Sequence, residues 1–284
     1  MAEFGIRERL KISWEATPLW VQIPPAAQIV AKLTINKKFF SSWNSEMAYV
    51  LGFITADGYV GVKRIRKDKS KQYFLDITSK DFSLLKKIKK IMGANQKIGI
   101  KYGGPNKKEK CYRLQIGYQE ICKDLLKLGI RPKKSSTLNS IKIPEEYFPD
   151  FLRGFFDGDG SVYIYKVNGT PQIKAHIVSA SFSFIKELNR LICKRLNIPE
   201  KTVHKEPGGN FSIYAIYFYI DDCEKLFQFM YGNNPVLYLP RKRRVFEKWK
   251  SIKRRHYIKQ NYPSKIGWHL NQSYRLGSYS KIST

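Results

Sequence analysis

The sequence predicts an α+β protein made of two copies of one αββαββα unit. An apolar stretch that ends in Asp-Gly occurs twice, at residues 46–60 and 147–164. Two further blocks of the first copy, at 76–92 and 120–129, recur in the same order in the second copy. Three blocks in one order indicate a duplicated domain, because an internal repeat reflects a repeated structural unit.

Each copy predicts the same elements in the same order. The apolar helix ends at the Asp-Gly, and the alternating pattern that follows, at 60–74 and 161–177, predicts a pair of strands. A helix then opens near Ser79 or Ser179, where polar residues precede an apolar run of helical period, as they do at an N-cap. A second strand pair, which includes the apolar run 211–220, and a short final helix complete the unit.

The repeat divides the chain into five segments. These are an N-terminal extension of unassigned role at 1–35, the first half at 36–135, a linker at 136–147, the second half at 148–250 and a basic tail at 251–284. Prolines and small polar residues fill the connection between the halves, a composition that favours irregular structure. Lys and Arg dominate residues 241–259, and the period of the apolar residues among them predicts a basic helix.

The charge of the chain narrows the class of partner. Its 284 residues carry a net charge of +29 at pH 7, with 52 Lys and Arg against 23 Asp and Glu. A compact chain of this charge repels itself unless a polyanion is its partner, which favours nucleic acid. A membrane surface is the alternative, but the longest apolar run is too short to cross a bilayer. We therefore expect nucleic acid and no membrane as the partner.

The N-terminus indicates an intracellular protein, and the cysteines give no sign of a metal site. No basic region followed by an apolar core and a small-residue cleavage site is found at the start, so we expect a protein of the cytoplasm, nucleoid or an organelle that is not secreted. The cysteines form no C-x-x-C pair and have no histidine at zinc-finger spacing, so all are interpreted as buried thiols. They are Cys111, Cys122, Cys193 and Cys223.

Asp57 and Asp159 occupy equivalent positions at the ends of the two apolar helices. The plain interpretation of Asp-Gly is a turn, because Asp tolerates strained dihedral angles and Gly allows positive φ. A carboxylate at a helix C-terminus, however, faces the negative end of the macrodipole, so two in equivalent positions indicate a cation between them. Hard divalent ions such as Mg²⁺ bind carboxylate oxygens.

Small residues at four-residue spacing predict that the two apolar helices pack on each other. Gly inside a helix costs about 1 kcal/mol relative to Ala, so its presence suggests close approach of two backbones. The alternative is that each helix packs only on its own sheet. The interface candidates are Ala48, Gly52 and Gly154. Parallel packing would bring the two aspartates together.

The stretches VLGFITADG (50–58) and LRGFFDGDG (152–160) resemble the paired motifs of the LAGLIDADG homing endonucleases, in the monomeric two-motif form. The resemblance covers roughly residues 46–249. It implies two four-stranded antiparallel sheets, joined by two packed motif helices into a saddle that binds double-stranded DNA. It also implies hydrolysis of one phosphodiester in each strand of a long target site, with Mg²⁺ or another divalent cation bound by the last acid of each motif. Thr55 departs from the pattern, which has an acid at that position.

The same resemblance assigns site residues. The catalytic and metal-binding candidates are the last acid of each motif and the residue before it: Asp57, Asp159, Ala56 and Gly158. A basic residue after the last helix of each repeat is also implied, by position Lys134 in the first half and Arg241 or Lys242 in the second. Such a residue can neutralise charge that develops on the phosphate. A plain phosphate contact is the alternative role.

Polar and basic side chains along the strands after each motif are the candidates for reading DNA. Successive side chains of a strand point to opposite faces, so one face can bury a core while the other contacts bases. Arg and Lys suit guanine, and Gln suits adenine. A solvated basic face is the alternative for any one of them. The candidates are Lys63, Arg64, Arg66, Gln72, Tyr163, Tyr165, Gln172, Lys174 and His176, with Arg241 as a further contact.

Two classes of function compete. The first is a homing endonuclease encoded by a mobile intron. The second is a binding protein on the same scaffold, either an intron-RNA maturase or a regulator without catalysis, which makes intron RNA the second candidate partner. A regulator should tend to lose one or both acids, and Asp57 and Asp159 are both present. Because one chain holds both halves of the site, we expect a monomer.

Overall fold

The first half of the chain folds in the order that the repeat predicts. The computed structural model describes residues 33–261, except 66, 68–69, 104–107, 133, 140 and 208–211. The elements of this half are α1 (Ser45–Asp57), β1 (Gly58–Ile65), β2 (Lys71–Ser79), α2 (Phe82–Ile91), β3 (Gly99–Gly103), β4 (Glu109–Ile116) and α3 (Gln119–Lys127). Both the number and the order of these elements confirm the αββαββα prediction for this half.

The second half repeats the same order. Its elements are α5 (Phe148–Asp159), β5 (Gly160–Val167), β6 (Thr170–Ser179), α6 (Phe182–Leu196), β7 (His204–Glu206), β8 (Ile213–Tyr219) and α7 (Ile220–Tyr231). Between the halves lie the short helix α4 (Lys134–Thr137) and the 3-10 turn η1 (Glu145–Tyr147). The predicted basic helix is α8 (Pro240–Asn261), which runs through residue 250, so the second half and the start of the tail share one helix.

Each half forms one four-stranded antiparallel sheet, as expected. The strand orders are β1-β2-β4-β3 and β5-β6-β8-β7, so the two sheets have the same topology. Along β6 the apolar side chains of Ile173, Ala175 and Ile177 are buried, and the polar residues between them are only half-buried. This alternation gives each sheet a core face, covered by helices, and an outer face.

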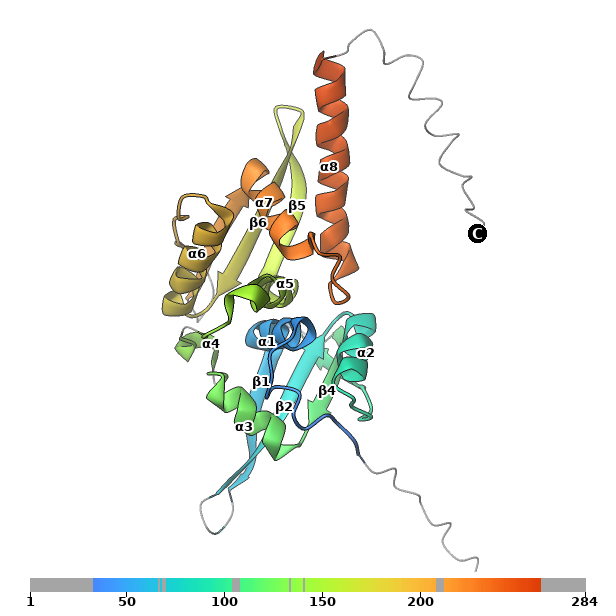
Figure 1. Cartoon of the computed structure of the whole chain (residues 1–284), viewed down its shortest axis with the longest axis vertical. Coiled ribbons are helices and arrows are strands. Elements are labelled where there is room, and N and C mark those ends of the chain that lie inside the picture. Colours follow the sequence, from blue (N-terminus) through green and yellow to red (C-terminus); the bar gives the residue numbers. More distant parts are fainter. Residues whose placement is uncertain are drawn as a thin grey trace, which may run out of the picture. The chain divides into compact units, whose positions relative to one another are not determined.

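The motif helices α1 and α5 pack directly on each other between the two sheets (Figure 1). A Cβ on Gly52 would lie 2.0 Å from the carbonyl oxygen of Phe151, and a Cβ on Gly154 would lie 2.0 Å from that of Tyr49. Only glycine allows backbones to approach this closely. The predicted helix–helix interface is therefore confirmed, and Gly52 and Gly154 form its centre, with the fully buried Ala48 one turn before Gly52.

Local signals explain where the motif helices begin and end. Asn44 caps α1, because its side chain accepts a hydrogen bond of 2.8 Å from the backbone N–H of Met47. Pro149 lies in the first turn of α5, where its missing N–H costs nothing. Both helices stop at a glycine in extended conformation, with φ of −86° at Gly58 and −93° at Gly160. These glycines have no positive φ, so the strained-turn interpretation of Asp-Gly does not describe them.

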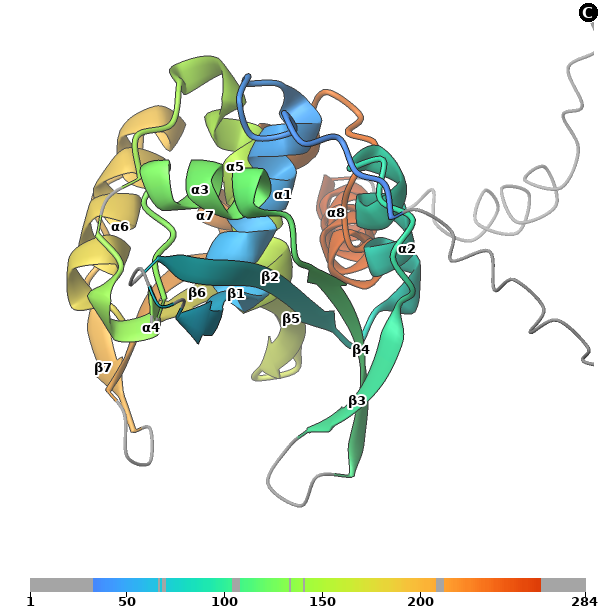
Figure 2. The ribbon, with the colours of Figure 1, turned by 90° about the horizontal axis from the view of Figure 1, so that it is seen from below.

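Figure 2 shows the described unit from below, with α1 and α5 through its middle and the strands of both sheets on one side of them. None of the helices in the described ranges is both long and apolar enough to cross a membrane.

Cys122, Cys193 and Cys223 are buried free thiols, as predicted. The prediction is wrong for Cys111, which is half-buried because it lies in β4 beside the exposed outer strand β3.

Candidate active site

The C-terminal ends of α1 and α5 lie together and carry the two motif acids. A Cβ on Gly158 would lie 2.3 Å from the Cβ of Ala56 and 3.4 Å from Oδ2 of Asp57, so the last turns of the helices are in contact. Asp57 is the last residue of α1, and Asp159 is the last residue of α5. The helices therefore pack in parallel, and the structure brings the two predicted acids to one place.

Burial and mutual repulsion make this pair of acids receptive to a cation. The pKa of Asp159 is raised to about 7, first by burial and then by the charge of Asp57, against the opposing charges of Lys134 and Lys242. Burial also raises the pKa of Asp57, and the same two lysines oppose it. The side chain of Asp57 is exposed, whereas that of Asp159 is half-buried. Ionisation therefore costs more free energy at Asp159 than at Asp57.

Lys134 closes the carbonyl end of α1. Its buried ammonium donates hydrogen bonds to the carbonyl oxygens of Thr55, at 2.7 Å, and Ala56, at 3.0 Å. The last four carbonyl groups of a helix have no partner within the helix and carry its negative pole, so a lysine there satisfies and stabilises them. The chain thus supplies a positive charge at the carbonyl end of α1.

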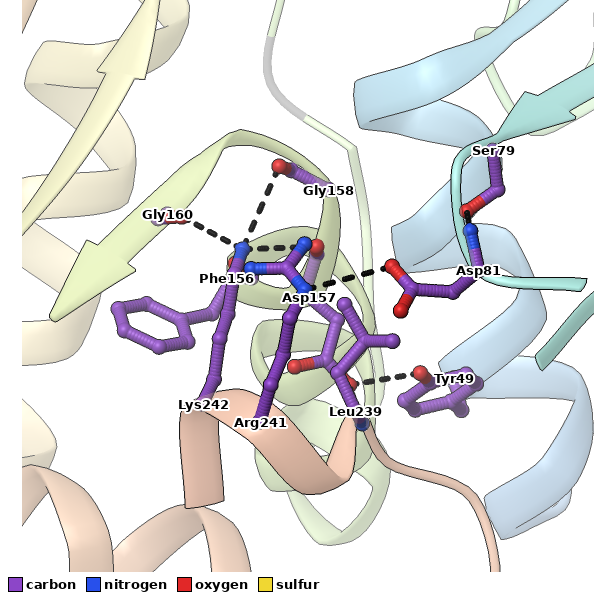
Figure 3. Close-up of polar contacts among 10 residues, drawn as sticks. All are labelled: Tyr49, Ser79, Asp81, Phe156, Asp157, Gly158, Gly160, Leu239, Arg241 and Lys242. Atoms are coloured by element: carbon purple, nitrogen blue, oxygen red, sulfur yellow. Dashed lines mark hydrogen bonds and ion pairs between the residues drawn. The ribbon is translucent and has the colours of Figure 1, made fainter. Parts of the chain in front are cut away.

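Lys242 does the same for α5. This buried lysine of the first turn of α8 donates to the carbonyl oxygens of Phe156 at 2.6 Å, Asp157 at 2.7 Å and Gly160 at 2.5 Å. Figure 3 shows its ammonium group among these carbonyl oxygens. Lys134 and Lys242, predicted by position alone, therefore occupy equivalent places in the two halves.

Burial lowers the pKa of the ammonium groups of both lysines. Burial lowers the pKa of Lys242 to about 8, although Asp157 and the two motif acids oppose this shift. Burial likewise lowers the pKa of Lys134, and Asp159 and Asp57 oppose it. An ammonium group of low pKa can both stabilise a developing negative charge and give up its proton near neutral pH.

The donor set at the helix ends fits a hard divalent cation. Asp57 and Asp159 offer carboxylate oxygens, and Mg²⁺ is commonly held by one or two carboxylates with several waters. In the described part of the chain no group of three or more His, Cys, Asp or Glu residues could hold a metal. The carbonyl oxygens of Ala56 and Gly158, the other metal candidates, accept from Lys134 at 3.0 Å and Lys242 at 3.4 Å. A carbonyl oxygen has a second lone pair, so this does not exclude them.

Two hollows lie at the ends of the motif helices. One, of about 240 Å³, is lined by Lys134, Asp159 and Ser179, among others. The lysine of the first half and the acid of the second half therefore line the same hollow. The other, of about 310 Å³, is lined by Gly158, Arg241 and Lys242, among others. Each acid-bearing helix end therefore has open space beside a buried lysine.

The five DNA-reading candidates of the second half lie on the outer face of its sheet. They are Tyr163, Tyr165, Gln172, Lys174 and His176. Lys174 pairs with Tyr163 across β5 and β6, and Gln172 pairs with Tyr165, whose hydroxyl lies 3.0 Å from Oε1 of Gln172. The structure therefore brings these residues together on one surface.

Strands β8 and β7 also contribute to this surface, which the strand pattern after the motifs did not predict. Tyr217 pairs with His176 and its hydroxyl donates to Oε1 of Glu206 at 2.8 Å, while the ammonium of Lys174 lies 3.8 Å from the centre of the Tyr217 ring. His204 packs edge-on against the same ring. The alternation within residues 213–219 could have predicted that Tyr217 and Tyr219 share the outer face, because Ile216 and Phe218, which alternate with them, are apolar and buried.

The candidates of the first half are described only in part. Lys63 is exposed at an irregularity of β1, and Arg64 pairs with Gln72 across β1 and β2. Arg66 lies outside the described residues. A missed residue is Arg113 of β4, whose Nε donates to Oδ2 of Asp76 at 2.7 Å. Such a fixed guanidinium suits contact with guanine.

Arg241 faces the first half. Its Nε lies 3.4 Å from Oδ2 of Asp81, at the start of α2, and its side chain is largely exposed (Figure 3). This ion pair joins α8 to the opposite half. The charge of Arg241 also acts to lower the pKa of Asp57, against burial, but Lys242 rather than Arg241 holds the carbonyl end of α5.

Asp157, in the sixth position of the second motif, was also missed as a site residue. Its Oδ2 accepts from the hydroxyl of Tyr49 at 2.7 Å and from the backbone N–H of Leu239 at 2.8 Å. The pKa of Asp157 is raised to about 6 by burial, which the Tyr49 hydrogen bond and the charge of Lys242 oppose. The departure of Thr55 from the family pattern could have drawn attention to this position.

Comparison with known proteins gives the same fold. Residues 150–231 match the family model described as a LAGLIDADG-like domain. The solved structure of the LAGLIDADG meganuclease I-AabMI bound to uncleaved DNA is 17% identical, with a TM-score of 0.51, and the match covers 76% of this chain and 92% of that one. The LAGLIDADG homing endonuclease I-GzeII in complex with its DNA target is 14% identical, with a TM-score of 0.50, covering 78% and 93%. None of the curated proteins matches the chain in sequence.

Proposed function

We propose that this chain, which has two LAGLIDADG motifs and the fold of the two-motif LAGLIDADG homing endonucleases, is a site-specific DNA endonuclease. The observation that carries the proposal is the meeting of Asp57 and Asp159 between two equivalent sheets of one chain, with a buried lysine at each helix end. The net charge of +29 favours a polyanionic substrate. Two proteins of matching fold, I-AabMI and I-GzeII, are described as bound to DNA.

The outer faces of the two sheets are the proposed DNA-binding surface. Basic and aromatic side chains gather there, including Lys174, Tyr217 and Arg113. Lysines contact phosphates and set the register, whereas Arg113 and Gln172 have the geometry to contact base edges. Because each sheet has its own set of side chains, the two halves read different sequences, and the target has no strict two-fold symmetry.

The helix ends are the proposed catalytic centre. Asp57 and Asp159 would hold the divalent cation, which is Mg²⁺ in this proposal and which, when bound, activates water and stabilises the leaving oxygen. In this proposal the ammonium groups of Lys134 and Lys242 lie near the scissile phosphates of bound DNA and offset the negative charge that develops on their oxygens. With two acids and two lysines, one chain can cut one phosphodiester in each strand.

The biological setting is part of the proposal. A homing endonuclease of this kind is encoded by a mobile intron and acts on the DNA of the cytoplasm, nucleoid or an organelle. RNA binding to the same basic surface stays a prediction, as does maturase activity.

The test starts from random DNA, because selection by the protein itself identifies the target. A pool of random DNA duplexes is bound by the full chain in Ca²⁺, enriched, and then exposed to Mg²⁺ or to EDTA. We expect a defined set of sequences that are cut in both strands in Mg²⁺ and stay intact in EDTA. The matched control is the Asp57→Asn, Asp159→Asn double variant, which should enrich the same sequences without cutting them. Enrichment with no cleavage in Mg²⁺ or Mn²⁺ would favour the regulator instead.

A further inference from the structure

Asp157 is buried where α5 meets the start of α8. Its side chain is 2% exposed, although carboxylates are almost never buried without partners. Oδ2 accepts two hydrogen bonds, from Tyr49 of the opposite motif helix and from the backbone of Leu239 (Figure 3). Oδ1 has no partner among the described residues. Burying a carboxylate with one unpartnered oxygen costs free energy, which indicates that the hydrogen bonds of Oδ2 have a specific structural role.

The bond to Leu239 fixes the residue that immediately precedes α8. Lys242 lies one helical turn further on, and its ammonium returns to the carbonyl end of α5, on which Asp157 itself lies. The carboxylate of Asp157 and the ammonium of Lys242 thus bind the first turn of α8 to α5 from two sides. If the bond to Leu239 is lost, this turn can move away and take Lys242 with it.

The first motif has no such arrangement. Thr55 stands in the equivalent position, and its hydroxyl donates to the carbonyl oxygen of Leu51 in its own helix at 2.7 Å. Lys134 begins the short helix α4, and its position is secured by Leu138, whose carbonyl oxygen accepts a 2.6 Å hydrogen bond from Ser181 of the opposite half. The two lysines are therefore equivalent in place but held by different means.

The start of α8 has other anchors: Leu237 and Leu239 are buried, and Arg153 donates to the carbonyl oxygen of Leu237 at 2.8 Å. None of these contacts uses the backbone N–H of Leu239, which donates to Asp157. The ion pair between Arg241 and Asp81 is long, at 3.4 Å, and its arginine is 59% exposed, and exposed pairs contribute little. Phe246 and Trp249 bury the body of the helix but lie one and two turns beyond Lys242. They hold α8 on the second half without determining where its first turn points.

We infer that Asp157 is a positioning residue for Lys242: its buried carboxylate holds the start of α8 so that the ammonium stays on the carbonyl end of α5, and only the second motif depends on such an acid. The consequence for cleavage rests on the proposed function. The placement of Lys242 does not, because it can be measured in the free protein.

The experiment measures the rate at which each lysine of the full chain reacts with an amine-acylating reagent in EDTA, by mass spectrometry of the digest. It is carried out at about pH 10, where Lys242, with a pKa of about 8, is neutral with or without the charge of Asp157 that raises this pKa, so the rate reports exposure of the amine. Asp157→Thr gives the second motif the residue of the first. It should raise the labelling rate of Lys242 by about tenfold. Loss of a hydrogen bond to a charged group raises the equilibrium constant for local opening of the first turn of α8 by about this factor. Lys134 is the internal control and should keep its rate. Asp157→Asn should leave both rates unchanged, because its amide oxygen can accept the same two hydrogen bonds.

The inference is overturned if Lys242 stays protected in Asp157→Thr, or if Lys134 and Lys242 become reactive together, which would indicate general unfolding. It is also overturned if Asp157→Asn exposes Lys242 as strongly as Asp157→Thr does. Should Asp157→Thr fail to fold, Tyr49→Phe removes one donor that orients the carboxylate. Lys242 should then react severalfold faster, and an unchanged rate would count against the inference.

Cleavage gives a second readout on an enriched target. Asp157→Thr should lower the single-turnover rate about as much as Lys242→Met does, with little change in DNA affinity, and the double variant should be no slower than Lys242→Met alone. Additive losses would contradict an action through Lys242. If no variant and no parent protein cuts DNA, the proposed function fails, and the labelling result still stands.

Discussion

The two motif acids occupy positions at which a carboxylate destabilises the folded protein. Asp57 and Asp159 lie at the negative ends of two helices, beside each other and partly out of water. Within the described structure neither carboxylate accepts a backbone hydrogen bond, so the interpretation as structural turn residues has no contact to support it. What offsets the repulsion is positive charge, supplied by Lys134 and Lys242.

This repulsion predicts a pH-dependent stability of the metal-free protein. The pKa of Asp159 is about 7 in the folded state, whereas a free Asp has a pKa of about 3.9. The folded state therefore binds this proton more tightly, and the free energy of unfolding should fall as the pH rises from about 4 to about 7. Asp159→Asn should make this fall smaller, with Asp157, whose pKa is raised to about 6, still contributing to it, and should gain on the order of 1 kcal/mol at pH 8, since half-burial moderates the effect.

Thermal unfolding in EDTA at pH 5 and pH 8 measures the difference between the parent and Asp159→Asn. The same variant should lose Mg²⁺-dependent cleavage of an enriched target, because the cation would lose a carboxylate. An Asp159→Asn protein that is less stable than the parent at pH 8, yet still cuts both strands, would refute the role that we give to this acid.

At the scale of elements, the contact between α1 and α5 depends on two glycines. Gly52→Ala would place a methyl group 2.0 Å from the carbonyl oxygen of Phe151, and backbone cannot move as a flexible side chain does. We expect a loss of about 1–3 kcal/mol of stability, the usual cost of overpacking, with the same result for Gly154→Ala. The measurement is the free energy of unfolding in urea.

Gly117→Ala is the matched control for these variants. A Cβ there meets nothing within 4 Å, so stability should change little. If Gly52→Ala unfolds at the same urea concentration as Gly117→Ala, the close approach of the two motif helices is wrong.

The helix α8 combines a docked start with a basic extension. Ile252 packs against the core and Lys253 pairs with Glu224 at 2.9 Å, so a chain that ends after Lys253 keeps the docked part. We expect this truncation to weaken binding to all DNA sequences alike. The log–log salt dependence should become flatter by about 0.9 for each lost phosphate contact.

The comparison is made by titration of target and non-target duplexes across a range of salt. As a control for loss of positive charge away from the proposed surface, Lys86→Gln and Lys90→Gln remove exposed lysines of α2, which covers the opposite face of its sheet, and the slope should hold. An unchanged slope in the truncated chain would mean that residues beyond 253 do not contact DNA.

At the scale of the molecule, one chain contains both acids, both lysines and both sheets. We therefore expect one chain per target duplex, because the internal two-fold arrangement already supplies what a single-motif protein would obtain from a dimer. Sedimentation of the complex formed in Ca²⁺ gives the stoichiometry. Two chains on one duplex would contradict the completeness of the site within the chain.

The sequence by itself determined the repeat, the order of elements, the helix ends at Asp57 and Asp159 and the small residues of the helix interface. These features are local: they depend on the period of apolar residues, on caps and on glycines, all of which can be read within a short stretch of the chain. Strand alternation also predicted which residues of β5 and β6 share a face.

Only the tertiary structure decided which groups surround the acids. Lys134 reaches a carbonyl 79 residues away in sequence, and Asp157 meets the backbone of Leu239 across a separation of 82. The resemblance predicted both lysines by position, but no local pattern marks the groups that they and Asp157 contact, because these depend on where α4 and α8 dock. The sequence accordingly determined where the two acids lie, and the packing of distant segments determined the charge and hydrogen bonding around them.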